Sequence, residues 1–202
     1  MLDRLSNGIF MKKLQIDIGR IGENIVANEL LAAGFLVTHL DKGTRGVSAN
    51  ADLLVGHPEI QKPALIQVKA TQADTLGHIF LGGLSLDIIE GRTPMFNHKS
   101  GFKADFIAAV SYKSNIEYRT FVLPIDHAER EALKIIRLWH NHPKKDGMQR
   151  AAIPKGYFAI DEQPAREGQE MRATMRKLAR EAFLDYENRW DLIKRFADPE
   201  TC

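Results

Sequence analysis

A single helix followed by three short apolar segments is the feature that most constrains how this chain can fold. From Asp17 to Ala33 the apolar residues gather on one broad side of a predicted helix. Gly34 follows, where a helix end favours a residue that tolerates positive φ. Three strand-length apolar segments come next, at residues 35–40, 51–55 and 64–68, each bounded by Gly, Pro, Asn or Asp. The order helix, strand, strand, strand predicts a mixed α/β core.

The sequence after this core predicts more strands and another helix. Strands are expected at residues 78–81, 105–112, 118–123 and 156–160. The segment 84–89 fits a short strand or a helical turn, and loops are expected at 90–103 and 141–150. Asp126 is a suitable N-cap and Glu129 follows three residues later, as a capping box requires, so a helix is expected at 126–139.

From Arg166 to Phe196 the apolar residues recur every three or four positions. They form one stripe, made of Met171, Met175, Leu178, Ala182, Tyr186, Trp190 and Ile193. Such a stripe predicts one long amphipathic helix or two helices in series, packed on the core or on a partner. We therefore expect an α/β core at residues 15–125 and a mainly helical extension at 126–202 packed on it. A homodimer through the C-terminal helix is an alternative use of the same stripe.

Composition excludes several classes of protein. The 202 residues carry 28 basic and 26 acidic side chains, a balance that does not by itself indicate a nucleic-acid-binding protein. Cys202 is the one cysteine, which rules out disulfides within the chain and cysteine-based zinc sites and suits a reducing cytoplasm. No apolar run approaches the ~18 residues that a membrane span needs, and Met1 to Lys13 do not have the pattern of a signal peptide. We expect a cytoplasmic protein that does not enter membranes.

Three polar side chains stand at the ends of the predicted second and third strands. Asp52 opens the second strand, while Gln67 and Lys69 close the third with Val68 between them. Because strand side chains alternate, Gln67 and Lys69 share one face and Val68 takes the other. If the two strands pair as a hairpin, a carboxylate, an amide oxygen and an ammonium meet at one edge of the sheet.

This combination suits magnesium-dependent hydrolysis of phosphodiesters. Mg²⁺ prefers oxygen ligands, often one or two carboxylates with water and substrate phosphate, and Mn²⁺ accepts the same set. The expected ligands are Asp52, the side-chain oxygen of Gln67 and a main-chain carbonyl such as that of Val68. Lys69 would orient a water molecule or stabilise developing charge. Each of these residues also has an ordinary structural interpretation, since an Asp at a strand start often forms a turn and a Lys at a strand end is usually solvated. Glu23, on the predicted first helix, is a fourth candidate, and it too could be an ordinary exposed helix residue.

The segments GRIGE at 19–23, Asn-Ala-Asp at 50–52 and QVK at 67–69 together resemble the PD-(D/E)XK superfamily of restriction-endonuclease-like nucleases. The nearest branches are those with Q-x-K in place of E-x-K, as in Mrr-type endonucleases. The glycine-containing loop 43–48 is also similar to that of archaeal Holliday-junction resolvases. The resemblance covers about residues 16–71, and its motifs are short.

This resemblance implies an α-β-β-β-α-β core with a mixed central sheet and Mg²⁺-dependent cleavage of DNA. It implies that Asp52 is the metal-binding Asp, Gln67 the second ligand and Lys69 the catalytic Lys, with Glu23 assisting the metal or the Lys. Ala51 replaces the Pro of the signature, and Gln67 removes one negative charge from the metal site. The alternative is therefore a catalytically degenerate nuclease fold that binds nucleic acid or a protein partner. A third alternative is an α/β interaction protein in which the motif is a coincidence.

A nuclease also needs contacts to phosphates. Lys42 and Arg45 lie in the loop before Asp52 and are expected to bind nucleic acid. Other loop cations extend this set, namely Lys99, Lys103, Lys144, Lys145 and Arg150. Late-helix cations are interspersed with Glu and fit a solvated face, namely Arg172, Arg176, Lys177 and Arg180. A zinc site at His140 and His142 remains an alternative, although no third and fourth ligand is evident.

Overall fold

The computed structural model describes residues 3–40, 51–60, 62–72, 78–81, 86–87, 95–96, 104–114, 116–142, 147, 156–159 and 170–196. Within these residues, helices pack against a five-stranded mixed sheet. The predicted α/β class is therefore confirmed. No helix in these stretches combines the length and the apolar character that crossing a membrane requires.

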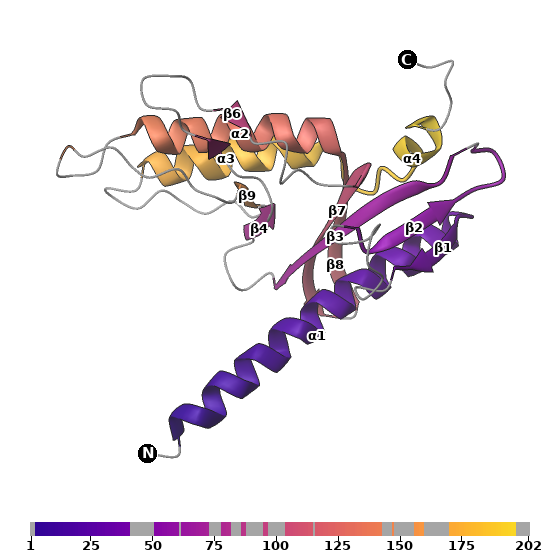
Figure 1. The fold of residues 1–202 in the computed structure, drawn as a ribbon, viewed down its shortest axis with the longest axis horizontal. Helices are drawn as coiled ribbons and strands as arrows, with labels where there is room; N and C mark the ends of the chain where they lie inside the picture. The colour runs from indigo at the N-terminus through magenta and orange to yellow at the C-terminus, as the bar shows by residue number, and fades with distance from the viewer. Residues whose placement is uncertain are drawn as a thin grey trace.

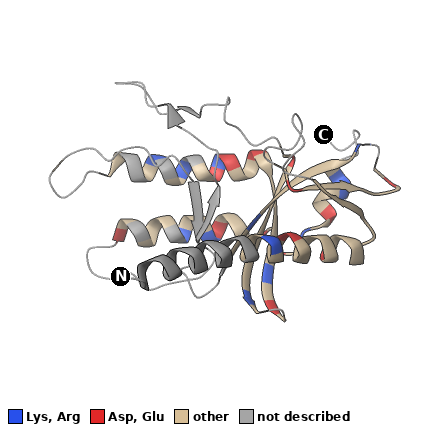
Figure 2. Cartoon of the chain, turned by 60° about the horizontal axis from the view of Figure 1, so that its bottom comes forward, with Lys and Arg blue, Asp and Glu red and all other residues tan. Residues whose placement is uncertain are grey.

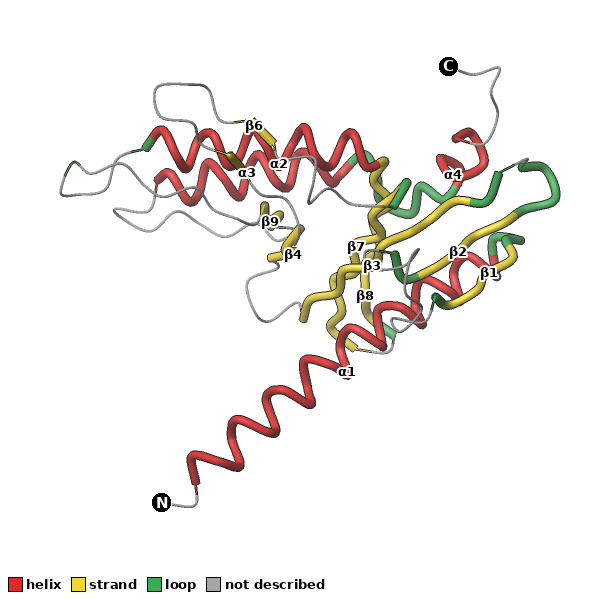
Figure 3. The backbone as a smooth tube through the Cα atoms, viewed as in Figure 1, coloured by secondary structure: helices red, strands yellow, loops and turns green. Residues whose placement is uncertain are grey.

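The five-stranded sheet has the order β1-β2-β3-β7-β8 (Figure 3). Its strands are β1 (Leu36–His39), β2 (Leu53–Gly56), β3 (Ala64–Gln72), β7 (Phe106–Ser114) and β8 (Glu117–Pro124). The neighbours β3 and β7 run parallel, and the other neighbouring pairs run antiparallel. Parallel neighbours need a crossover connection, so the chain leaves the sheet after β3 and returns at β7.

The crossover between β3 and β7 differs from the expected order of elements. The resemblance implies a helix there, whereas the described residues form three short strands: β4 (His78–Leu81), β5 (Leu86–Asp87) and β6 (Met95–Phe96). Strand β4 pairs with β9 (Gly156–Ala159), and β5 pairs with β6. Strand β6 lies in the segment predicted as a loop. Strand β3 continues past its predicted end at Val68, because β7 supplies a parallel partner as far as Gln72 opposite Tyr112.

Helix α1 spans Asp3–Ala32 and so begins well before its predicted start at Asp17. A nucleated helix lengthens at little cost, and residues 3–16 contain no proline. The C-terminus is as predicted, because Gly34 has a φ of 88°. The Gly34 N–H donates to the Leu31 carbonyl at 3.0 Å, and the N–H of Phe35 donates to the Leu30 carbonyl at 3.0 Å. This pair of hydrogen bonds is the Schellman motif.

Helices cover both faces of the sheet (Figure 1). On one face, α1 and α4 (Asp191–Phe196) pack over the strands through side chains that include Val26, Leu30, Ile66, Val68, Phe106 and Ile193. On the other face, α2 (Ile125–Asn141) and α3 (Glu170–Leu184) lie side by side and pack through Ile107, Ala109, Phe121, Ile135, Met175 and Phe183. The strands β7 and β8 therefore carry buried apolar side chains on both faces.

The C-terminal apolar stripe forms two helices in series, α3 and α4. Met175 and Ala182 are buried against α2 and the sheet, and Ile193 is buried on the opposite face. This packing accounts for the stripe inside the chain, so the stripe gives no support to a homodimer. The division into a core at 15–125 and an extension at 126–202 stays a prediction.

Helix α2 begins at Ile125, one residue earlier than predicted, and Asp126 lies in its first turn rather than at the N-cap. An acidic side chain there still favours the helix, because the N-terminal end of the dipole is positive. The Ile125 N–H donates to the Asp105 carbonyl at 3.0 Å, which ties the start of α2 to the start of β7.

Candidate functional site

The Asp52 side chain lies at the end of the β2–β3 ladder. The last pair in register is Leu53 opposite Ile66. Beyond it, the Asp52 N–H donates to the Ile66 carbonyl at 2.9 Å, and Asp52 Oδ2 accepts the backbone N–H of Val68 at 2.8 Å. The carboxylate is thus fixed beside the backbone of β3, at the residue that follows Gln67.

Gln67 is a buried polar residue whose amide oxygen has no partner. The residue is 6% exposed, and Gln67 Oε1 accepts no hydrogen bond from the described part of the protein. A buried acceptor without a donor costs roughly 1–3 kcal/mol. Native proteins retain such an atom where it has a function or meets a group from outside the chain.

Lys69 shares the face of the sheet with Gln67. Gln67 is in register with Ile107 and Lys69 with Ala109, and both β7 residues belong to the apolar cluster under α2 and α3. Val68 points the other way, into the cluster under α1. The alternation expected from the sequence is therefore present. Gln67 and Lys69 thus lie on one face of β3, and Asp52 is bonded to the backbone of Val68 between them. The chemical roles of the three residues stay predictions.

Glu23 approaches β3 from the other side. Helix α1 lies against the Val68 side of the strand, because a Cβ built on Gly22 would overlap the Cβ of Ala70 and lie 3.6 Å from Val68 Cγ1. Glycine at position 22 thus allows a close approach of α1 to β3 and brings Glu23, which is half-buried, near the strand. Its assistance to the site stays a prediction.

Several predicted residues lie outside the described residues. These include the phosphate-contact candidates Lys42 and Arg45, all five loop cations, and the side chains of Arg172, Arg176 and His140. His142 is exposed at the end of α2. In the described stretches, no three His, Cys, Asp or Glu side chains gather as a metal would require.

Asp105 is a structural counterpart of Asp52 that sequence reasoning missed. Its Oδ2 accepts the backbone N–H of Leu65 at 2.8 Å, and its own N–H donates to the Leu65 carbonyl at 2.8 Å. Both aspartates follow an Ala, precede an apolar residue at the start of a strand, and accept an N–H from β3. That repeated Ala-Asp-apolar pattern is the signal that would have found it. Asp105 anchors the register of β3 and β7, and with it the places of Gln67 and Lys69.

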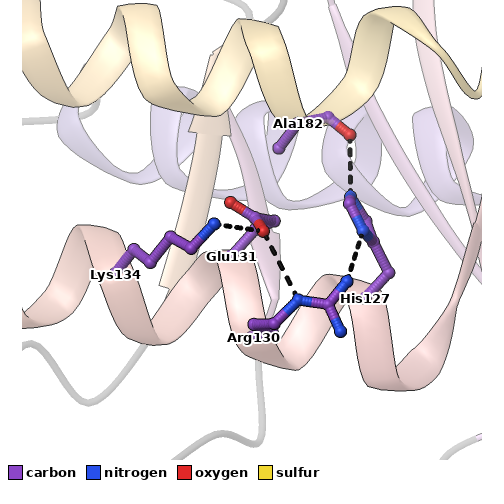
Figure 4. A network of polar contacts seen from close by, with 5 residues as sticks. All are labelled: His127, Arg130, Glu131, Lys134 and Ala182. Atoms are coloured by element: carbon purple, nitrogen blue, oxygen red, sulfur yellow. Dashed lines mark hydrogen bonds and ion pairs between the residues drawn. The ribbon is translucent and has the colours of Figure 1, made fainter.

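A polar network joins the two helices that cover this face (Figure 4). His127 Nε2 lies 3.1 Å from the Ala182 carbonyl in the last turn of α3, and His127 Nδ1 lies 3.0 Å from Arg130 Nη2. A carbonyl only accepts and a guanidinium only donates, so these two contacts suit a ring that donates from Nε2 and accepts at Nδ1. Glu131 lies 2.7 Å from Lys134 and 3.7 Å from Arg130.

Charges of both signs alternate over the described helices (Figure 2). Glu131 on α2 pairs with two cations, and Glu181 on α3 lies 3.9 Å from Lys177. This distribution agrees with the solvated face expected for the late helix. Acidic and basic side chains thus lie within ion-pair distance of one another on both α2 and α3.

A second polar cluster ties the turn after α3 to strand β8. Thr120 is fully buried, and its Oγ1 lies 2.8 Å from Glu29 Oε2 and 2.6 Å from Asn188 Oδ1. Burial, together with the charge and hydrogen bond of the Glu29 carboxylate, raises the pKa of Tyr118. Arg119 donates two hydrogen bonds of 2.8 Å to Glu187 and thereby lowers the pKa of that carboxyl group.

No family model and no curated protein matches the sequence. A solved structure of a bacterial homing endonuclease is similar to this chain at a TM-score of 0.42 and 15% sequence identity. The match covers 89% of this chain and 92% of that one. Likeness at this level says nothing about function.

Proposed function

We propose that the protein is a divalent-metal-dependent nuclease that hydrolyses phosphodiester bonds in DNA, with a PD-(D/E)XK core. One observation carries the proposal. Asp52 Oδ2 accepts the Val68 N–H at 2.8 Å, and Val68 stands between Gln67 and Lys69, which share one face of β3. Gln67 Oε1 is buried and accepts no hydrogen bond among the described residues. A purely structural role explains the Asp52 hydrogen bond but gives no reason for the unsatisfied amide oxygen that is buried at Gln67, the residue before Val68.

The residues present fit a hard cation. Asp52 and Gln67 offer a carboxylate and an amide oxygen, and the Val68 carbonyl is the expected third ligand. Mg²⁺ or Mn²⁺ held there would supply Lewis-acid polarisation of the phosphodiester and a lower pKa for a bound water. The orphaned Gln67 oxygen is the feature that a cation would satisfy.

The other residues act on the substrate through charge and position. The Lys69 ammonium would orient a water molecule or stabilise the negative charge that develops on the phosphate in the transition state. The hydrogen bond from Val68 fixes the orientation of the Asp52 carboxylate in advance. Glu23 on α1 would assist the metal or Lys69. Lys42 and Arg45 would contact the backbone of the nucleic acid.

The neutral side chain of Gln67 also favours a second function. An amide in place of a carboxylate removes one negative charge from the site, which weakens magnesium binding. The alternative is a nuclease fold that binds nucleic acid or a protein partner without cutting. Cleavage assays separate the two.

The test is plasmid and oligonucleotide cleavage with Mg²⁺ or Mn²⁺ against an EDTA control. We expect metal-dependent cleavage that Lys69→Ala abolishes, with DNA binding and folding nearly unchanged. The matched control is Lys113→Ala. Lys113 is an exposed lysine at the end of β7, and its Nζ lies 2.6 Å from Glu117 Oε1. Binding without cleavage by the unaltered protein favours the second function. Cleavage that survives Lys69→Ala contradicts the role of Lys69.

A further inference from the structure

The two edges of the five-stranded sheet differ in how they are covered. At the β8 edge, the Val122 N–H donates to the Tyr186 carbonyl at 2.9 Å. The Asn188 N–H donates to the Thr120 carbonyl at 3.0 Å, so the turn after α3 covers this edge. At the β1 edge, none of the described residues forms a backbone hydrogen bond on the side that faces away from β2 (Figure 1).

Strand β1 lacks the features that usually protect an edge. The segment LVTHL at 36–40 contains no Lys, Arg, Asp, Glu or Pro, and β1 pairs with β2 without a register shift. Leu36 is 69% exposed, and Leu31 in the last turn of α1 is 54% exposed. An exposed and uncharged edge strand is a template for pairing with another strand.

The backbone groups that β1 directs outward belong to Val37 and His39. The Leu40 N–H donates to the Asp52 carbonyl at 2.9 Å, so Leu40 directs its backbone groups toward β2. Because these directions alternate along an antiparallel strand, Thr38 does the same, while Val37 and His39 point away from β2. An added strand, rather than a helix, presents donors and acceptors at the spacing that this edge offers.

We propose that a second copy of this chain pairs with β1 through its own β1, antiparallel, with a two-fold axis at Thr38. Val37 of each copy then exchanges both backbone hydrogen bonds with His39 of the other. Thr38 faces Thr38 across the axis, and Leu36 lies opposite Leu40, so an exposed leucine gains an apolar neighbour. This interface is separate from the C-terminal apolar stripe, which packs within the chain, and it does not depend on the proposed function.

The identical strand suits this edge because it is self-complementary. No like charges meet, since the segment carries no Asp, Glu, Lys or Arg. An axis at Val37 would instead place His39 opposite Phe35, whose N–H already donates to the Leu30 carbonyl at 3.0 Å. The axis at Thr38 satisfies the outward donors and acceptors of both Val37 and His39.

The first test places charges at the proposed axis. Thr38 is exposed, so neither Thr38→Lys nor Thr38→Glu should disturb the fold, which circular dichroism checks. In each variant like charges face each other only in the dimer, so sedimentation velocity over a concentration series should show dimerisation at least about tenfold weaker than in the unaltered protein. An equal mixture of the two variants should regain the dimer, because Lys then faces Glu. Ile116→Lys, at a residue of the β7–β8 turn that is 95% exposed, is the control and should dimerise as the unaltered protein does.

Cysteine cross-linking tests the register in a Cys202→Ser background. Thr38→Cys should form a disulfide-linked dimer on mild oxidation, because opposed residues of a non-hydrogen-bonded pair have Cα atoms roughly 4.5 Å apart. His39→Cys should not, because each His39 lies opposite Val37, which puts the two copies of His39 beyond the ~7 Å between Cα atoms that a disulfide spans.

Each part of the proposal can fail separately. A protein that stays monomeric at every concentration overturns the dimer. A dimer that Thr38→Lys leaves as tight as before overturns pairing through β1. Cross-linking of His39→Cys that is as efficient as that of Thr38→Cys overturns the axis at Thr38.

Discussion

Asp52 Oδ2 accepts the backbone N–H of Val68 at 2.8 Å, across sixteen residues of sequence. The bond joins the start of β2 to the part of β3 that lies beyond their last registered pair. The observed role of Asp52 in holding β3 has to be separated from its proposed role as a metal ligand.

Replacing Asp52 separates these roles. Asp52→Ala leaves the Val68 N–H without its acceptor, so we expect the free energy of unfolding to fall by about 1–3 kcal/mol. Asp52→Asn keeps an acceptor oxygen, so its cost should be below about 1 kcal/mol. Both variants should lose Mn²⁺ binding, because both lack the charge. Chemical denaturation and Mn²⁺ titration measure the two effects.

Asp105→Ala is the matched control, because Asp105 holds the N–H of Leu65 at the same 2.8 Å. It should lower stability to a similar degree and leave Mn²⁺ affinity unchanged. Equal loss of Mn²⁺ affinity in both alanine variants would show that strand geometry, rather than the Asp52 charge, controls metal binding.

Substitutions of Gln67 should change metal-free stability and Mn²⁺ affinity in opposite directions. Gln67→Leu removes the buried oxygen that has no partner, so we expect metal-free stability to rise by about 1 kcal/mol while Mn²⁺ affinity falls. Gln67→Glu buries a charge, so metal-free stability should fall and Mn²⁺ should restore it. Thermal unfolding with and without Mn²⁺ measures both. Metal affinity should be highest for Gln67→Glu, intermediate for the unaltered protein and lowest for Gln67→Leu. Three equal affinities would exclude Gln67 as a ligand.

Gly22 should tolerate no side chain. A Cβ at this position overlaps Ala70 Cβ, so Gly22→Ala must push α1 away from β3 and should cost about 1–3 kcal/mol of stability. Gly19→Ala is the control on the same helix, because a Cβ there meets nothing within 4 Å. That variant should gain about 0.5–1 kcal/mol from helix propensity. Urea denaturation of the two variants gives the comparison, and equal effects would contradict the close approach.

The Arg119–Glu187 pair should make stability depend on pH. The hydrogen bonds from Arg119 lower the pKa of Glu187 in the folded protein, so the pair stabilises the fold above the unfolded pKa. That contribution is lost as pH falls through the lowered folded pKa. The side chains are 41% and 34% exposed, so solvent screening should keep it below about 1 kcal/mol.

The measurement is the difference in unfolding free energy between Glu187→Gln and the unaltered protein at a series of pH values. The difference should be present at neutral pH and disappear in acid. In an Arg119→Gln background, Glu187→Gln should have little effect at neutral pH. A difference that persists in that background would assign the effect to another partner.

Local chemistry made several elements predictable from sequence. Gly34 ends α1 because a residue with φ of 88° is needed to close the Schellman bonds. The apolar stripe at 171–193 is buried or partly buried because its spacing matches a helix, whatever it packs against. The alternation of Gln67, Val68 and Lys69 follows from the pleat of any strand.

The sequence by itself determined the α/β class, the first helix and its end, and the shared face of Gln67 and Lys69, since each depends on residues that are near one another in the chain. Only the tertiary structure decided that β3 extends to Gln72 and that Asp52 and Asp105 both bind its backbone. It also decided that Gln67 Oε1 is buried with no hydrogen-bond partner among the described residues. These features depend on contacts between strands that are distant in sequence. Burial and hydrogen-bond satisfaction are properties of the packed sheet, and a local pattern such as Ala-Asp-apolar marks a residue without fixing its partner.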